Sequence, residues 1–239
     1  MTDGRIIYLL FARRPEAGEV KRRLAAEIGA KEAAELYSAF LGDILGAVRQ
    51  SGRPFAIGCT PAAAVDYFRT LAPEAAEVFA QEGGDLGERM AAASDRFFRA
   101  GYGRVVIIGS DIPLLSPEIL REAGEALKEA PVVFGPCRDG GYYLVGMNGP
   151  RPEIFAGIDW GTGKVLGQTI AKLRRGGAGC RLLGELEDID RGEDLERLAA
   201  VLARRRPGQY RPPRTALILE GSRTGLPDGS ECGKLKKYN

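Results

Sequence analysis

The chain of 239 residues contains no histidine. This absence excludes Ser-His-Asp and Cys-His nucleophilic machinery and removes the commonest general base and histidine-rich metal sites. Any metal ion would therefore be held by carboxylates, which suits Mg²⁺ or Mn²⁺ bound beside phosphate groups. A carboxylate is also the best remaining candidate for a general base, provided that its surroundings raise its pKa.

Cysteine is scarce, and its four positions show no recognisable spacing. Cys59, Cys137, Cys180 and Cys232 lie far apart, and without a C-x-x-C pair no zinc knuckle or redox motif is predicted. The chain also lacks a long apolar run and a signal peptide, so we expect no membrane span. These absences together favour a cytoplasmic protein.

Charge is nearly balanced overall but unevenly spread. The formal net charge is +2, yet nine Lys/Arg stand against three Asp/Glu from Arg204 onward, leaving 25 basic and 29 acidic residues before it. This distribution argues against nucleic acid as a partner of the globular part. Proline, glycine and basic residues dominate after residue 206. We therefore predict a globular domain at 1–206 and a loosely packed basic tail at 207–239, with at most an edge strand at 215–220.

The most informative stretch is R-V-V-I-I-G-S-D-I-P-L-L at residues 104–115. Four consecutive β-branched aliphatic residues are typical of a strand buried on both faces. Pro113 forbids an immediate helix, so Asp111 should lie just beyond the carboxyl end of a central parallel strand. Ligands bind at that edge of open α/β sheets, although an Asp in an ordinary strand-to-helix turn is the alternative.

Basic residues follow the first strand. An apolar run at 5–11 is succeeded by a Pro/Gly loop and a predicted helix at 19–28, which carries Lys21, Arg22 and Arg23 in its first turns. Cations there oppose the helix dipole unless an anion is present, so phosphate binding is favoured over a solvated basic face.

Further along, D-G-G at 139–141 separates two apolar runs, 131–135 and 142–147, which indicates an antiparallel insertion in a parallel sheet. The helix expected at 85–100 begins with Asp85, which either caps it or, after two glycines, contacts a ligand. The single Trp160 lies between glycines and either belongs to the core or walls a sugar or base pocket. Asp188 and Asp190 precede a predicted helix as capping residues or as a second set of metal ligands.

Six motifs in order carry a family resemblance. They are F-A-R-R-P-E-A-G-E-V-K-R-R-L (11–24), G-D-L-G-E-R-M (84–90), G-S-D-I-P-L-L (109–115), G-P-C-R-D-G-G-Y-Y-L-V-G (135–146), I-D-W-G-T-G-K-V-L (158–166) and D-I-D-R-G-E-D-L (188–195). The chain resembles a bacterial family of GT-A-like glycosyltransferases, some of which are linked to arsenosugar biosynthesis. It departs from the family pattern at Arg22, where threonine is usual, and at Gly161, where serine is usual.

The resemblance implies a Rossmann-like GT-A fold, a three-layer sandwich of the nucleotide-diphospho-sugar transferase superfamily. It implies that Asp111 and Asp190 bind Mg²⁺ or Mn²⁺ and that Lys21 and Arg23 contact the nucleotide phosphates. Asp111 and Asp139 are the expected catalytic residues, with Asp139, in its glycine-flanked loop, the candidate for acceptor binding or base catalysis. The expected nucleotide and phosphate contacts are Ala12, Arg13, Lys21, Arg23, Asp85 and Ser110. The expected acceptor or sugar pocket comprises Gly140, Gly141, Tyr142, Trp160 and Thr162.

Three functions remain open at this point. The favoured one is transfer of a glycosyl group from a nucleotide-diphospho-sugar to a small acceptor. The alternative is a nucleotidyltransferase that joins an NTP to a phosphorylated or hydroxylated molecule and releases pyrophosphate. A nucleotide-binding protein without catalysis is the third, and the presence of three well-spaced aspartates speaks against it. The base, sugar, acceptor and oligomeric state are left open by the sequence.

Overall fold

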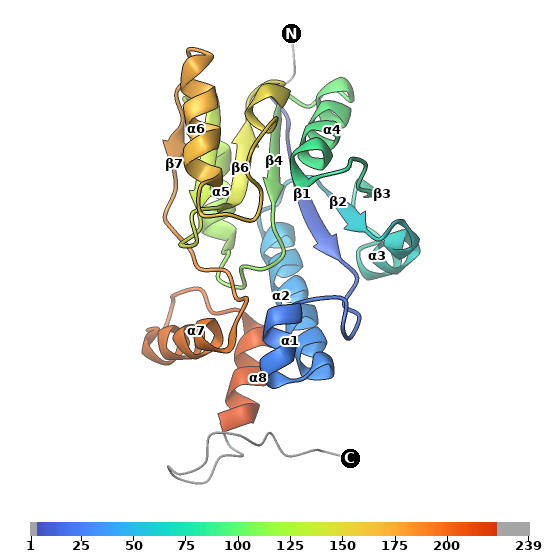
Figure 1. Ribbon diagram of the computed structural model, residues 1–239, viewed down its shortest axis with the longest axis vertical. Helices are drawn as coiled ribbons and strands as arrows, with labels where there is room; N and C mark the ends of the chain where they lie inside the picture. Colours follow the sequence, from blue (N-terminus) through green and yellow to red (C-terminus); the bar gives the residue numbers. More distant parts are fainter. Residues whose placement is uncertain (1–3, 224–239) are drawn as a thin grey trace.

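A seven-stranded sheet lies at the centre of the computed structural model, which describes residues 4–223 (Figure 1). The strands are β1 (Ile6–Arg13), β2 (Phe55–Thr60), β3 (Glu77–Ala80), β4 (Arg104–Ile108), β5 (Val132–Pro136), β6 (Tyr142–Met147) and β7 (Arg181–Leu182). They are arranged in the order β3-β2-β1-β4-β6-β5-β7. β6 runs antiparallel to β4 and β5, whereas the other pairs are parallel. The predicted mostly parallel sheet with an antiparallel insertion is confirmed.

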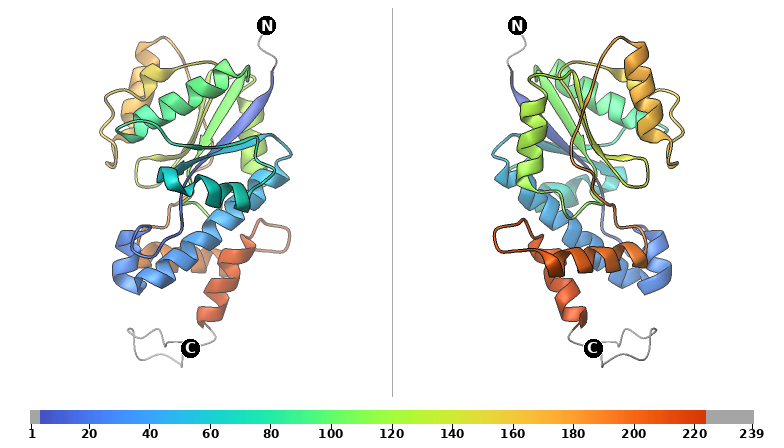
Figure 2. Two further views of the ribbon diagram at one scale, coloured as in Figure 1. Left: turned by 90° about the vertical axis from the view of Figure 1, so that its right-hand side faces the viewer. Right: turned by 90° about the vertical axis from the view of Figure 1, so that its left-hand side faces the viewer.

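Helices cover both faces of this sheet (Figure 2). Successive side chains of β1 point to opposite faces, so Tyr8 and Leu10 enter one core while Ile7 and Leu9 enter the other. The first core is closed by α2 (Ala30–Gln50), α3 (Val65–Leu71) and α5 (Pro117–Ala126), and the second by α4 (Leu86–Arg99) and α6 (Val165–Arg175). Short 3₁₀ turns, η1 (Ala62–Ala64) and η2 (Pro152–Ile154), complete the connections. The result is the expected three-layer sandwich.

A third core forms below the sheet, where α1 (Arg22–Ile28), α7 (Gly192–Arg204) and α8 (Pro213–Arg223) gather around the first half of α2 (Figure 1). Leu24, Phe40, Leu198 and Ala216 are all buried in it. Elements from the two ends of the described chain therefore pack together, beside the carboxyl ends of β1 and β4.

The structure at the end of β4 agrees with the prediction for residues 104–115. Val105 to Ile108 are buried, and the Gly109 amide donates to the Tyr143 carbonyl at 2.9 Å. Pro113 delays the next helix until Pro117, where the Ser116 side chain accepts from the Ile119 amide as an N-cap. Asp111 is thereby held in an extended turn rather than drawn into a helix.

Two expectations for the C-terminal part need correction. Residues 215–220 form part of the helix α8, not an edge strand, and the described portion of segment 207–239 packs on α2 rather than hanging loosely. The physical reason is Asp43 of α2, which is buried and accepts hydrogen bonds from the Arg214 and Thr215 amides at 2.9 and 2.8 Å. It caps α8 from a distant part of the chain. The domain boundary at residue 206 itself stays a prediction.

Within residues 4–223, no helix combines the length and the apolar character needed to cross a membrane. Cys59, Cys137 and Cys180 are free thiols, and Cys232 lies outside the described residues. The cytoplasmic location stays a prediction.

Candidate active site

Lys21 lies at the centre of the candidate site. The helix α1 begins at Arg22, later than predicted, because Lys21 adopts a left-handed conformation with φ of 48° and serves as its N-cap. Its side chain is only 4% exposed, and its Nζ lies 2.6 Å from Asp111 Oδ1 and 3.1 Å from Asp190 Oδ1. Burial opposes the charge, but the two carboxylates outweigh it and raise the pKa of Lys21. The predicted partners Asp111 and Asp190 thus meet on one ammonium group.

The segment that carries Asp190 is fastened to the sheet by backbone hydrogen bonds. Leu186 forms a parallel bridge with Cys137, and the Ile189 amide donates to the Asp111 carbonyl at 3.3 Å. Ile189 is buried in the third core, so this extended segment is held tightly on its way to α7. Contacts 50 to 80 residues apart in sequence therefore bring Asp188 and Asp190 to the edge where Asp111 ends β4.

Asp139 is positioned by a glycine turn. Its Oδ1 accepts a hydrogen bond from the Gly141 amide at 2.8 Å, and Gly140 has a left-handed φ of 88°. A Cβ on Gly140 would lie 2.2 Å from the Gly163 carbonyl oxygen, so the two glycine loops touch backbone to backbone. The Gly140 carbonyl also accepts from the Leu166 amide at 2.9 Å. The loop at Gly140 and the loop at Gly163 both need glycine because of this close contact.

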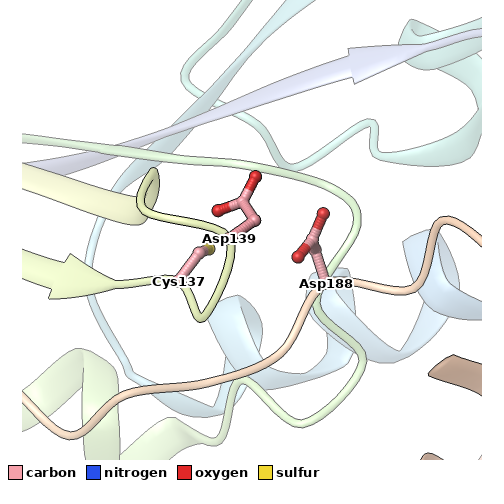
Figure 3. A group of neighbouring side chains, drawn as sticks. All are labelled: Cys137, Asp139 and Asp188. Atoms are coloured by element: carbon pink, nitrogen blue, oxygen red, sulfur yellow. The ribbon is translucent and has the colours of Figure 1, made fainter. Parts of the chain in front are cut away.

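Cys137, Asp139 and Asp188 form a compact group, and one ligand atom of each lies within 4.8 Å of the others (Figure 3). Burial, together with the charges of Asp139 and Asp190, raises the pKa of Asp188 to about 6. Burial and the neighbouring aspartates also raise the pKa of the Cys137 thiol. Among the described residues, neither Asp139 nor Asp188 forms an ion pair with lysine or arginine. The group is therefore short of positive charge.

A hydroxyl of α2 connects the two loops that end β1 and β4. The Tyr37 hydroxyl accepts from the Arg13 amide at 3.0 Å and shares a hydrogen bond with Ser110 Oγ at 2.8 Å. Burial, and secondarily the charge of Asp111, raises the pKa of Tyr37 to about 12, so it remains a neutral phenol. The hydroxyl fixes the distance between the first loop and the Asp111 turn.

Two cavities meet at this edge of the sheet. The larger, of about 780 Å³, which we call the basic cleft, is bordered by the cations Arg13, Lys21, Arg22, Arg23 and Arg89. The smaller, of about 370 Å³, which we call the apolar pocket, is bordered by Met90, Ile107, Tyr142, Trp160 and Val165 together with Asp111, Asp139 and Asp188. Phe11, Leu86, Gly109, Asp111 and Tyr142 border both cavities. Asp111 therefore stands at their junction.

The residues expected from the sequence fall on these cavities in two groups. All six expected nucleotide contacts border the basic cleft: Ala12, Arg13, Lys21, Arg23, Asp85 and Ser110. Gly141, Tyr142, Trp160 and Thr162 border the apolar pocket, whereas Gly140 does not and acts through its contact with Gly163. Asp85 also caps α4 by accepting from the Glu88 amide at 2.7 Å, as its alternative interpretation expected. The roles of these residues in binding and catalysis stay predictions.

Asp188 was expected only as a capping residue or as part of a second set of metal ligands, and the structure places it beside Asp139. Tyr37 and Arg89 were not expected at the site, since each looks like an ordinary member of an amphipathic helix until the tertiary contacts are known.

A family model described as "Uncharacterized protein conserved in bacteria (DUF2064)" matches residues 45–162. Comparison with curated proteins gives no match. Among solved structures, one from Desulfovibrio desulfuricans G20, described as a "putative nucleotide-diphospho-sugar transferase", is 33% identical. The alignment covers 92% of this chain and 95% of that one, with a TM-score of 0.84.

More distant structures share the fold. Rv0371C from Mycobacterium tuberculosis H37Rv, solved as a complex with manganese, is 17% identical over 81% of this chain and 97% of its own, with a TM-score of 0.50. A 4-diphosphocytidyl-2C-methyl-D-erythritol synthase is 14% identical over 80% of this chain and 95% of its own, with a TM-score of 0.52. This chain thus shares its fold with a putative nucleotide-diphospho-sugar transferase and, at lower similarity, with Rv0371C and a 4-diphosphocytidyl-2C-methyl-D-erythritol synthase. The resemblance carried by the six motifs is confirmed, and the chain belongs to the bacterial DUF2064 family.

Proposed function

We propose that this chain is a metal-dependent glycosyltransferase that binds a nucleotide-diphospho-sugar in the basic cleft and passes the glycosyl group to a small acceptor in the apolar pocket. The observation that carries the proposal is the junction at Asp111. The basic cleft meets the apolar pocket there, and among the described residues no lysine or arginine borders the apolar pocket. The relative from Desulfovibrio, 33% identical over 92% of this chain, is described as a "putative nucleotide-diphospho-sugar transferase", which supports transferase activity.

The basic cleft suits a diphosphate. Arginine can hold a phosphate through two parallel hydrogen bonds, while lysine contributes a compact charge. Lys21 is presently shared between two aspartates, and Arg23 lies 3.6 Å from Asp190. A bound diphosphate would compete with these carboxylates for the same cations.

The aspartates at this edge of the sheet fit a hard divalent cation; they are Asp111, Asp139, Asp188 and Asp190. Carboxylate oxygens are preferred ligands of Mg²⁺ and Mn²⁺, and the uncompensated pair Asp139 and Asp188 would gain most from a positive charge. Cys137 fits less well, since a raised pKa keeps its thiol protonated. Asp111 and Asp190, with Asp188 added, would hold the ion. Bound there, it would neutralise the charge that develops on the departing nucleoside diphosphate. Rv0371C, which shares the fold, was solved as a complex with manganese.

Asp139 borders the apolar pocket but not the basic cleft, which supports a role toward the acceptor. Its Oδ1 already accepts from the Gly141 amide, so the other oxygen can accept the proton of an acceptor hydroxyl. Removal of that proton makes the hydroxyl oxygen a stronger nucleophile toward the sugar carbon.

Nucleotidyl transfer is the second candidate. The cleft has five cations that could contact a triphosphate, and a 4-diphosphocytidyl-2C-methyl-D-erythritol synthase shares the fold. In that case pyrophosphate, not a nucleoside diphosphate, would leave.

Product analysis separates the two. The protein is incubated with Mg²⁺ or Mn²⁺, panels of nucleotide sugars and NTPs, and a metabolite extract as acceptor source. We expect a free nucleoside diphosphate that appears only with a nucleotide sugar and a divalent ion, and that disappears in Asp111→Asn. Release of pyrophosphate from an NTP would instead establish nucleotidyl transfer. Tight nucleotide binding with neither product would refute both.

A further inference from the structure

We propose that the acceptor is an uncharged alcohol with an apolar body, and not a phosphate ester, a carboxylic acid or a free sugar. The inference rests on the proposed function, because it takes the apolar pocket as the acceptor site. It adds the chemical class of molecule that this pocket selects.

The distribution of charge excludes an anionic acceptor. On the described walls of the apolar pocket there is no lysine or arginine, and its ionised groups are the carboxylates Asp111, Asp139 and Asp188. A phosphate or carboxylate placed there would be repelled by Asp139 and Asp188, which have no ion-pair partner among the described residues, and repulsion is poorly screened in partly dry surroundings. Lys21 beside Asp111 is already shared by two carboxylates, and the proposed divalent ion would serve the departing nucleoside diphosphate. The basic cleft next door has five cations beside the four carboxylates Glu19, Asp85, Asp111 and Asp190. Two adjoining cavities with such different charge are built for different groups.

The walls of the pocket also exclude a molecule with many hydroxyls. The larger part of its surface comes from apolar side chains: Phe11, Leu86, Met90, Ile107, Leu144, Val145, Trp160 and Val165. The Tyr142 hydroxyl and Trp160 Nε1 have no hydrogen-bond partner among the described residues, but both atoms are buried. A sugar held against these walls would therefore leave several hydroxyls without partners, which is costly in a buried site. The volume of about 370 Å³ is within the range of about 300–1,000 Å³ usual for small-molecule sites.

The carboxylates of the pocket lie together. Asp111 borders both cavities, the residue after Asp188 donates its amide to the Asp111 carbonyl, and Asp188 lies beside Asp139. The Thr162 hydroxyl is already used, since it donates to the Asp159 carbonyl at 2.7 Å. A single hydroxyl can therefore be held at the aspartates, where it can be deprotonated, while the rest of the molecule contacts the apolar walls.

Trp160 makes the inference directly measurable. It is the only tryptophan of the chain and it lines the pocket, so its fluorescence reports occupancy without any need for turnover. The full chain is titrated in EDTA, and again with Mg²⁺, with three probes that share a cyclohexyl ring and differ in their polar group. They are cyclohexylmethanol, cyclohexanecarboxylate and cyclohexylmethyl phosphate. We expect a saturable change with the alcohol and at least about tenfold weaker binding of both anions, a difference of about 1.4 kcal/mol.

A substitution that adds a positive charge tests whether the charge of the pocket causes the weaker binding of anions. Leu86 is 45% exposed and borders both cavities, so Leu86→Arg adds a cation to the rim with little disturbance of packing. The carboxylate should then bind within about threefold of the alcohol. Leu217→Arg is the matched control: Leu217 is 71% exposed on α8 and should leave all three affinities unchanged.

The outcomes separate this inference from the function on which it rests. Equal binding of the anions and the alcohol to the unaltered chain would overturn it, as would a flat Trp160 signal with all probes. Calorimetry with UDP and GDP in the presence of Mg²⁺ tests the basic cleft independently. If a nucleoside diphosphate binds while the alcohol does not, only the acceptor class is wrong. If neither binds, the proposed function fails as well.

Discussion

The ammonium of Lys21 lies 3.1 Å from a carboxylate oxygen of Asp190, although 169 residues separate them in the chain. The same ammonium contacts Asp111 at 2.6 Å. A side-chain cation thus stands where the sequence predicted a metal ion between two aspartates. In the absence of metal it balances charges that would otherwise repel one another.

Replacement of Lys21 should therefore make stability depend on metal. In EDTA, Lys21→Met should lose about 1–3 kcal/mol of unfolding free energy, less than for a fully buried pair because both aspartates are partly exposed. Mg²⁺ should raise the melting temperature of this variant more than that of the unaltered chain. Lys31→Met, at an exposed pair with Glu35, is the control. An equal Mg²⁺ effect on all three proteins would show that no cation binds between the aspartates.

Asp111→Asn should weaken nucleotide binding that depends on Mg²⁺ by about tenfold or more, because a neutral amide is a poor substitute for a carboxylate ligand. Calorimetry with and without Mg²⁺ measures the effect. Circular dichroism should show an unchanged fold, since the side chain is half exposed. Asp66→Asn, at an exposed pair with Arg69, should behave like the unaltered chain. Undiminished Mg²⁺-dependent binding in Asp111→Asn would remove Asp111 from the site.

Asp43 should be among the most sensitive positions for stability. It is 2% exposed and accepts from two amides and from the Thr215 hydroxyl at 2.7 Å. Asp43→Ala leaves those donors unpaired, and we expect a loss of about 2–4 kcal/mol in urea unfolding. Asp95→Ala, on the exposed surface of α4, should stay within about 0.5 kcal/mol. A comparable loss in both variants would contradict the capping role.

Two glycines in helices should respond to alanine in opposite ways. A Cβ on Gly87 would lie 2.5 Å from the Phe155 carbonyl and 2.8 Å from Trp160 Nε1, so Gly87→Ala should destabilise the protein and shift its tryptophan emission. Gly167 of α6 has no atom within 4 Å of its virtual Cβ. Gly167→Ala should therefore stabilise by about 0.5–1 kcal/mol through helix propensity. Thermal unfolding with fluorescence detection measures both, and stabilisation by Gly87→Ala would refute the close contact.

Tyr37 and Ser110 should be energetically coupled. Tyr37→Phe removes the hydroxyl that joins the Arg13 amide to Ser110, and should cost about 1 kcal/mol of stability. A double-mutant cycle with Ser110→Ala should give a coupling energy of about 0.5–1.5 kcal/mol. Strict additivity would mean that the hydrogen bond contributes nothing.

Local sequence patterns predicted most of the fold. The buried aliphatic run of β4, the Ser116-Pro117 start of α5 and the D-G-G turn before β6 each depend on neighbours within a few residues. These patterns predict structure reliably because apolar periodicity, helix capping and turn formation depend on residues that are close in the sequence. The first loop was predicted less well: helix α1 starts after Lys21, which has a left-handed backbone conformation and whose side chain contacts two aspartates far away in the sequence.

Tertiary contacts account for what local patterns missed. The apolar run within Thr215–Glu220 suggested at most an edge strand, yet the carboxylate of Asp43 caps this segment as a helix. Asp188 joins Asp139 only because Leu186 pairs with Cys137. Neither contact has a signature within a single stretch of sequence. The cavities themselves depend on side chains from both faces and both ends of the domain.

The backbone contact between Gly140 and Gly163 has a consequence for altering substrate range. No side chain separates the loop of Asp139 from the loop of Trp160, so the proposed base and one wall of the acceptor pocket form a single rigid body. Remodelling that wall would move the base with it. Leu86 and Met90 of α4 border the same pocket, and α4 contacts Trp160 through Gly87 without a backbone contact of this kind to the Asp139 loop. New acceptors should therefore be accommodated from α4, where the pocket can change shape while the base stays in place.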